Sequence, residues 1–151
     1  MAQKPMVLDR DIISLYTDEM IALSEETRAP KRLENPDATA SAVSPICGST
    51  VTLDMTFDGD KISAIGYDVE SCALGRAVMA ILLKTAPGKT AKDITAAGKA
   101  LEDLLEGRTE NIALTGWEKL QIMAPVRDYP ARHNAVLLPF ATAEKLFRNK
   151  S

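Results

Sequence analysis

The segment that decides the fold is TVTLDMTFDGDKISAIGYDV, residues 50–69. Its first half alternates between apolar and polar side chains, which is the period of a β-strand with one buried face. The apolar set is Val51, Leu53, Met55 and Phe57, and Asp54 belongs to the polar face. An Asp58-Gly59 step follows, and the alternation resumes from Lys61, so a β-hairpin is predicted. The second run changes phase between Ala64 and Ile65, which indicates a β-bulge.

Helices are predicted around this hairpin. From Cys72 the pattern is helical and almost wholly apolar until Pro87-Gly88, with Ser71 as a candidate cap. Further helices are predicted over residues 9–26, 90–106, 117–123 and 132–148, the second capped by Thr90. Pro139 should kink the last helix or delay its start. A third strand is predicted near residues 42–46, and residues 27–42 are interpreted as an extended surface linker.

These elements predict an α+β fold, a small antiparallel sheet of about three strands packed against several helices. The chain has 151 residues, of which 46% are hydrophobic and 26% charged. This length suits one domain over residues 1–151, with an N-terminal helix and linker at 1–34 and a core at 35–151.

Composition also excludes some classes of function. The formal net charge is −3 and the basic residues are scattered, which argues against nucleic-acid binding. No apolar stretch approaches the roughly 20 residues of a membrane span, and the N-terminus lacks the pattern of a signal peptide. We therefore expect a cytoplasmic protein without a membrane partner. Two cysteines in that compartment are not expected to form a structural disulfide.

The two cysteines flank the hairpin. Cys47 lies in Ser44-Pro45-Ile46-Cys47-Gly48, a turn sequence before the first strand, and Cys72 opens the apolar helix after the second. The outer ends of a hairpin meet in space, so the two thiols should lie at one site. Backbone N–H groups at a helix start favour the thiolate, the form that binds metal or attacks sulfur. Burial as two small apolar residues is the alternative. His133, the single histidine, is a candidate third ligand or a packing residue.

These blocks resemble the IscU/SufU/NifU-N family of iron–sulfur cluster assembly scaffolds. An Asn35-Pro36 step precedes the Cys47-Gly48 loop and an alternating strand. The turn 59–62 leads to a cysteine that opens an apolar helix, and a Pro-Ala-Arg block, residues 130–132, precedes the last helix. The resemblance covers about residue 35 to the C-terminus.

The resemblance implies a ligand set that this chain holds only in part. In the family, three cysteines and an aspartate, with a histidine in some branches, bind zinc or hold a nascent cluster. Cys47 and Cys72 match the first two cysteines, whereas Ser49 stands at the aspartate position. Ala135 stands at the third cysteine, and Asn134 aligns with the histidine, one residue after His133.

Three functions follow as hypotheses. The first is a non-enzymatic scaffold that binds metal or sulfur through Cys47 and Cys72, with His133 as a possible third metal ligand. The resemblance implies a transient iron–sulfur cluster or zinc as its cofactor, and a cysteine desulfurase and further copies of the chain as partners. The second is an interaction or regulatory module that kept the fold and lost cluster assembly. The third is a thiol-based sulfur-transfer protein, which requires an unusually reactive thiol.

Overall fold

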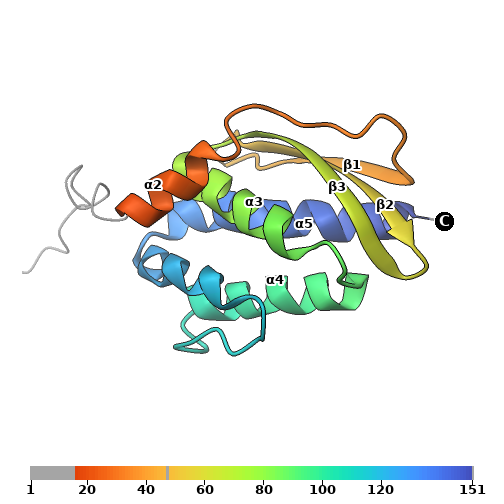
Figure 1. Cartoon of the computed structure of the whole chain (residues 1–151). Coiled ribbons are helices and arrows are strands. Elements are labelled where there is room, and N and C mark those ends of the chain that lie inside the picture. Colours follow the sequence, from red (N-terminus) through yellow and green to blue (C-terminus); the bar gives the residue numbers. More distant parts are fainter. Residues whose placement is uncertain (1–15, 47, 151) are drawn as a thin grey trace, which may run out of the picture.

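The computed structural model describes residues 16–46 and 48–150. Three antiparallel strands form one sheet in the order β1-β2-β3, with β1 at Ala38–Val43, β2 at Thr50–Asp58 and β3 at Lys61–Glu70. The helices are α2 (Asp18–Glu25), α3 (Ala73–Thr85), α4 (Ala91–Leu105) and α5 (His133–Asn149), with 3₁₀ segments η1 (Glu118–Asp128) and η2 (Pro130–Arg132). Figure 1 shows the sheet as one layer, α3 and α5 beneath it, and α4 on their far side. The predicted α+β class is confirmed.

The predicted hairpin is formed by β2 and β3. Its turn places Gly59 at φ +66°, a left-handed conformation that glycine adopts without strain. Thr56 pairs with Ala64 whereas Phe57 pairs with Ile62, so Ser63 is an extra residue in β3. This is the predicted bulge, one to two residues earlier than the sequence pattern indicated.

The third strand begins earlier than expected. β1 starts at Ala38, not near residue 42, and pairs with β2 from Ala38↔Met55 to Val43↔Thr50. Its sequence, ATASAV, holds small side chains of which only Ala40 is buried hydrophobic. Such a strand has little apolar alternation to detect, so the prediction missed its start.

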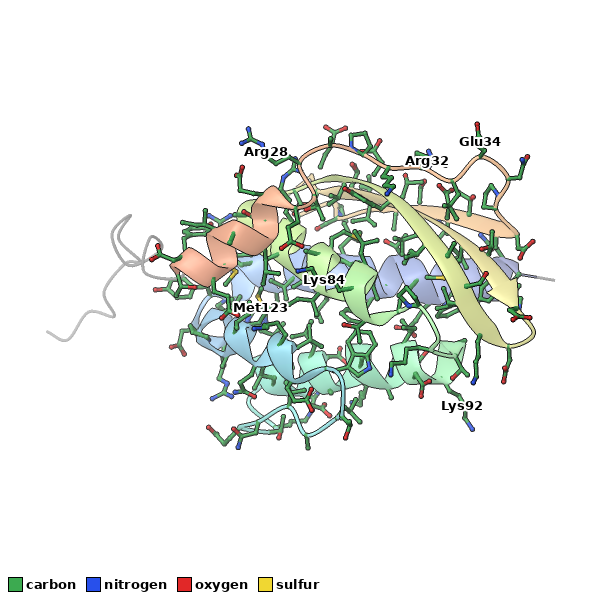
Figure 2. All side chains as sticks on the ribbon, in the orientation of Figure 1. Arg28, Arg32, Glu34, Lys84, Lys92 and Met123 are labelled. Carbon is green, nitrogen blue, oxygen red and sulfur yellow. The ribbon has the colours of Figure 1, made fainter. Side chains whose placement is uncertain are left out.

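Residues 28–37, here called the strap, cross the outer face of the sheet and make specific bonds with it. The backbone of Lys31 exchanges two hydrogen bonds with that of Tyr67 in β3, of 2.8 and 2.9 Å. A side chain at Gly66 would begin 2.7 Å from the backbone nitrogen of Leu33, so the strap lies directly on the strand. Figure 2 shows Arg32 and Glu34 along this segment. The linker prediction is corrected here, because the strap is a bonded cover of the sheet.

The strap buries Asp54, which the alternation placed on the solvent face. Its side chain is 0% exposed and accepts two hydrogen bonds from Arg32, of 2.6 and 2.9 Å. The backbone N–H of Leu33 and the hydroxyl of Thr39 also donate to it. The Arg32 guanidinium is the main cause that lowers the pKa of Asp54 below its usual value, against the opposing effect of burial.

Most helix ends lie close to where the local sequence signals predict them. Thr90 caps α4 in a capping box with Asp93, as the capping prediction stated. Pro139 lies inside α5, which begins at His133, so of the two predicted effects the delayed start is wrong and the kink stays a prediction. The predicted first helix is described only from α2, capped by Thr17, and residues 9–15 lie outside the described residues. None of the helices in the described part of the chain has the length and hydropathy of a membrane-spanning segment.

Candidate functional site

The two cysteine-bearing segments meet at the open end of the hairpin. Thr50, the first residue of β2, pairs with Glu70, the last residue of β3. The flanking hydroxyls of Ser49 and Ser71 then lie 3.1 Å apart, within hydrogen-bond distance. Ser49 is buried, with 5% of its surface exposed. The residue two positions after Cys47 therefore contacts the residue directly before Cys72.

The loop that carries Cys47 connects β1 to β2. Its closure rests on two backbone bonds of 2.8 Å, one from Ser44 N to Ser49 O and one from Gly48 N to Ser44 O. Gly48 has φ +75°, which explains a glycine at this position. Cys47 itself lies outside the described residues, so its contact with Cys72 stays a prediction.

Cys72 occupies the N-cap position of α3, which corrects the assignment of Ser71 as the cap. It has extended backbone angles and a half-buried side chain, and its carbonyl accepts the N–H of Arg76 at 3.1 Å. Within the described residues its thiol makes no capping hydrogen bond, and the first turn of α3 has no acidic residue. The thiol is thus close to the positive end of a helix dipole without a competing carboxylate on that turn.

Tyr16, from the N-terminal end of the described residues, lies near this thiol. Burial is the main cause that raises the pKa of the Tyr16 hydroxyl, and the Cys72 sulfur adds to that rise. The Arg132 charge opposes it. The half-buried thiol therefore has a phenol near it, and the Arg132 charge acts on that phenol.

His133 is turned toward η1 and the end of α4. Its Nε2 lies 2.9 Å from the carbonyl oxygen of Val126 and 3.2 Å from that of Arg127. Its Nδ1 lies 3.9 Å from a carboxylate oxygen of Glu106. Two carbonyl acceptors require the proton on Nε2, so that nitrogen has no free lone pair for a metal in this arrangement. The role of His133 as a third ligand stays a prediction that these contacts do not favour.

The two residues after His133 face the site instead. Asn134 lines a cavity of about 230 Å³ with Ser44, Pro45 and Ile46 of the Cys47 loop. The carbonyl oxygen of Ala135 lies 3.1 Å from the point where a side chain on Gly75 would begin, in the first turn of α3. The positions that match the family's histidine and third cysteine thus lie beside the two cysteine-bearing segments.

The donor set does not fit a closed zinc site. Structural zinc takes four ligands from cysteine, histidine and carboxylate side chains. In residues 16–46 and 48–150, no three such side chains form a group that could hold a metal ion. Cys72, the hydroxyls of Ser49 and Ser71, and the amide of Asn134 would leave a metal with one strong protein donor, or two with Cys47.

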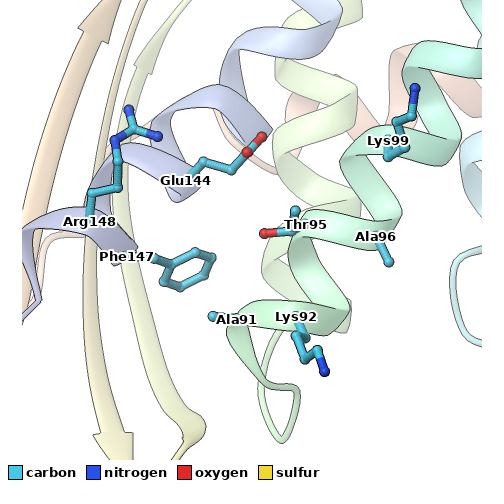
Figure 3. A pocket seen from close by; sticks show the side chains of 8 residues that line it. All are labelled: Ala91, Lys92, Thr95, Ala96, Lys99, Glu144, Phe147 and Arg148. Carbon is cyan, nitrogen blue, oxygen red and sulfur yellow. The ribbon is translucent and has the colours of Figure 1, made fainter.

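A larger cavity lies elsewhere, away from the cysteine-bearing segments. About 600 Å³ in volume, it is an open groove between α4 and α5, where Phe147 lies among Ala91, Thr95 and Glu144 (Figure 3). Lys92, Lys99 and Arg148 complete its rim. It contains no cysteine or histidine, so its size alone does not make it the site of the chemistry discussed here.

Comparison with known proteins places the chain in a family. The model of the NifU-like N terminal domain matches residues 15–136, and the chain belongs to that family. The iron-sulfur cluster assembly scaffold protein IscU of Streptococcus pyogenes serotype M1 is 26% identical over 88 residues. This alignment spans 58% of the present chain and 55% of that relative, about half of its length.

Two solved structures share the fold over nearly their whole length. A NifU-like protein (N-terminal part) from Brucella abortus superposes with a TM-score of 0.84 at 28% identity, covering 91% of this chain and 94% of that chain. A protein described as an iron-sulfur cluster assembly scaffold for the SUF system of Fervidobacterium islandicum AW-1 has a TM-score of 0.80 at 25% identity. That superposition covers 88% of this chain and 96% of the other.

Sequence reasoning missed several residues of the site. Tyr16 reaches the surroundings of Cys72 only through the packing of distant elements, so no local pattern predicts it. The sequence favours Ser71 as a helix cap, but its hydroxyl is hydrogen-bonded to that of Ser49 instead. The fixed spacing of Ser49 and Ser71 from the hairpin ends is the one pattern that could have predicted their contact.

Proposed function

We propose that this chain is an iron–sulfur cluster assembly scaffold with a reduced ligand set. The observation that carries the proposal is the 3.1 Å contact between Ser49 and Ser71, which joins the segments bearing Cys47 and Cys72. Membership of the NifU-like N-terminal family supports it, as do relatives that carry scaffold names. Cys47 and Cys72 are the proposed donors, and the cluster is cargo that the protein passes on.

The proposal requires donors from outside the chain. A [2Fe–2S] cluster is held by four thiolate or equivalent ligands, and one chain offers two cysteines. A second copy of the chain, a partner protein or a small thiol would supply the rest. His133 would have to leave the carbonyls of Val126 and Arg127 before it could contribute.

Anaerobic reconstitution tests the function. Purified protein is incubated with ferrous iron, cysteine, a cysteine desulfurase and dithiothreitol, which reduces the persulfide sulfur to sulfide, and bound iron and acid-labile sulfide are measured. We expect both in the wild type, a loss of most of both in Cys47→Ser and Cys72→Ser, and a smaller change in His133→Gln. Equal iron and sulfide contents in the wild type and both cysteine variants would refute the proposed site.

A desulfurase is the proposed partner, and the cytoplasm the proposed location. Val43 and Ile46 expose 59% and 69% of their surface beside the Cys47 loop, which is unusual for large apolar side chains and typical of a contact surface. Ile46→Asp should therefore weaken desulfurase binding by at least about tenfold, because it puts a charge into an apolar contact. Isothermal titration calorimetry measures this, with Ile21→Asp, an exposed apolar residue on α2, as the control. Equal loss of affinity in both variants would argue against docking at this loop.

The alternative is an interaction module that binds a desulfurase without holding a cluster. The serine and alanine at two family ligand positions favour it. Stoichiometric desulfurase binding combined with no iron or sulfide after reconstitution would select this function over the scaffold.

A further inference from the structure

The hydroxyl contact at the site is part of a longer chain of bonds. The Nε of Arg76, in the first turn of α3, donates to the carbonyl of Ser71 at 3.2 Å. Its Nη1 donates to the carbonyl of Thr27 at 2.9 Å. The buried hydroxyl of Thr27 donates in return to the carbonyl of Arg76 at 3.0 Å. Bonds therefore run without interruption from the end of α2, through Ser71, to Ser49.

Gly75 makes room for this arrangement. A side chain at Gly75 would begin 2.1 Å from the hydroxyl oxygen of Ser71, a distance that no real contact allows. Glycine inside a helix is less favourable than alanine by about 1 kcal/mol. The glycine at this position is thus explained by the space that the Ser71 hydroxyl occupies.

We propose that the hydroxyl bond between Ser49 and Ser71, here called the clasp, holds the two cysteine-bearing segments together without a metal ion, while Arg76 anchors Ser71 within its own segment. Where the family resemblance implies a metal-binding aspartate, this chain has Ser49, whose hydroxyl bonds across to the second segment. The clasp keeps the two segments together while the site is empty, so that a metal ion or cluster meets segments that are already adjacent. Ser49, Ser71 and Arg76 are positioning residues, and none of them is required to touch the cargo.

Two consequences separate the clasp from ordinary structural bonds. In the metal-free protein, loss of the Ser71 hydroxyl should release the Cys47 loop from α3 while the rest of the fold stays closed. With metal, the same loss should weaken binding by about tenfold or more, because groups that orient the ligands of a metal contribute 10- to 100-fold to affinity in other sites. The second consequence rests on the proposed function, and the first does not.

Ser71→Ala and Ser71→Thr test both consequences, with Ser63→Ala as the matched control. Ser63 makes the same kind of hydroxyl bond, 2.9 Å to Thr56, near the turn of the hairpin. Amide hydrogen exchange of residues 48–50 and 71–74 is measured in the metal-free proteins. We expect about tenfold faster exchange in Ser71→Ala, wild-type rates in Ser71→Thr, and no change at these residues in Ser63→Ala.

The affinity for Cd²⁺ is then measured by competition with a chelator. We expect about tenfold weaker binding in Ser71→Ala and recovery in Ser71→Thr. Wild-type exchange rates at both segments in Ser71→Ala would overturn the clasp, and so would acceleration spread over the whole chain. If Ser71→Ala does not fold, Ser49→Ala answers the same question from the other segment. Wild-type protein that binds no Cd²⁺ through its cysteines would refute the proposed function and leave the exchange test of the clasp intact.

Discussion

Asp54 is the residue whose surroundings differ most from what the sequence pattern suggests. Strand alternation assigns it to solvent, yet it is fully enclosed and accepts bonds from Arg32, Leu33 and Thr39. Three of its partners lie 15 to 22 residues away in the sequence. A short-range pattern carries no information on such contacts, and for this reason the sequence predicts a surface linker where the strap is bonded to the sheet.

Asp54→Asn should lower the free energy of unfolding by about 1–3 kcal/mol at pH 7, because it removes the negative charge from the charge-assisted pair with Arg32. The Arg32 side chain is half exposed, so solvent screens the pair and limits the loss. The lowered pKa of Asp54 sets the pH dependence. Its stabilising effect is fully present above the unfolded value, about 4, and is lost as pH falls through the lower folded value. Urea unfolding between pH 7 and pH 3 measures this. The difference between variant and wild type should shrink in acid, whereas Asp60→Asn, exposed in the hairpin turn, should match the wild type throughout.

Ser49→Asp tests whether the site lacks a metal ligand at position 49. It places a carboxylate at the position where the family resemblance implies an aspartate, beside the segment that bears Cys72. We expect zinc affinity to rise by about tenfold or more, because a third strong donor joins the two thiols. Chelator competition measures it, and Ser49→Asp combined with Cys72→Ser should lose the gain. Unchanged affinity in a folded Ser49→Asp protein would show that position 49 does not face the metal.

At the scale of elements, the strap should depend on Gly66. A methyl group there would lie 2.7 Å from Leu33 N and 2.8 Å from Lys31 O, both backbone atoms that cannot rotate away. We expect Gly66→Ala to displace the strap, to cost about 1–3 kcal/mol of stability, and to speed amide exchange at residues 31–33. Ser63→Ala on the same strand is the control. Stability and exchange equal to those of the wild type would mean that the strap does not lie on the strand as described.

The sequence predicts the elements that short-range signals define. It does not predict those that depend on packing against residues distant in the chain. The Asp58-Gly59 turn and the Thr90 cap act within a few residues of themselves, so the hairpin and α4 could be predicted. The start of β1 and the course of α5 through the buried Pro139 depend on neighbours distant in the sequence. The approach of the two cysteine-bearing segments is predictable from the hairpin, but the bonds of Arg76 to Ser71 and Thr27 are not.

At the scale of the whole molecule, the sheet and helices serve to bring two short segments together. The hairpin sets their spacing, and α3 supplies its positive end to Cys72. α5 presents Asn134 and Ala135 at the same place while its first residue, His133, turns to η1 and α4. The family's fold is therefore intact around a site with fewer strong donors.

The central claim is that Cys47 and Cys72 bind the same ion. It is tested most directly by titrating the reduced, metal-free protein with Cd²⁺ and recording the ultraviolet charge-transfer absorbance of cadmium–thiolate bonds. Our account predicts at least two thiolates for each bound ion in the wild type, with half the absorbance change or less in Cys72→Ser and in Cys47→Ser. One thiolate for each ion in the wild type, with the two cysteines filling independently, would contradict it.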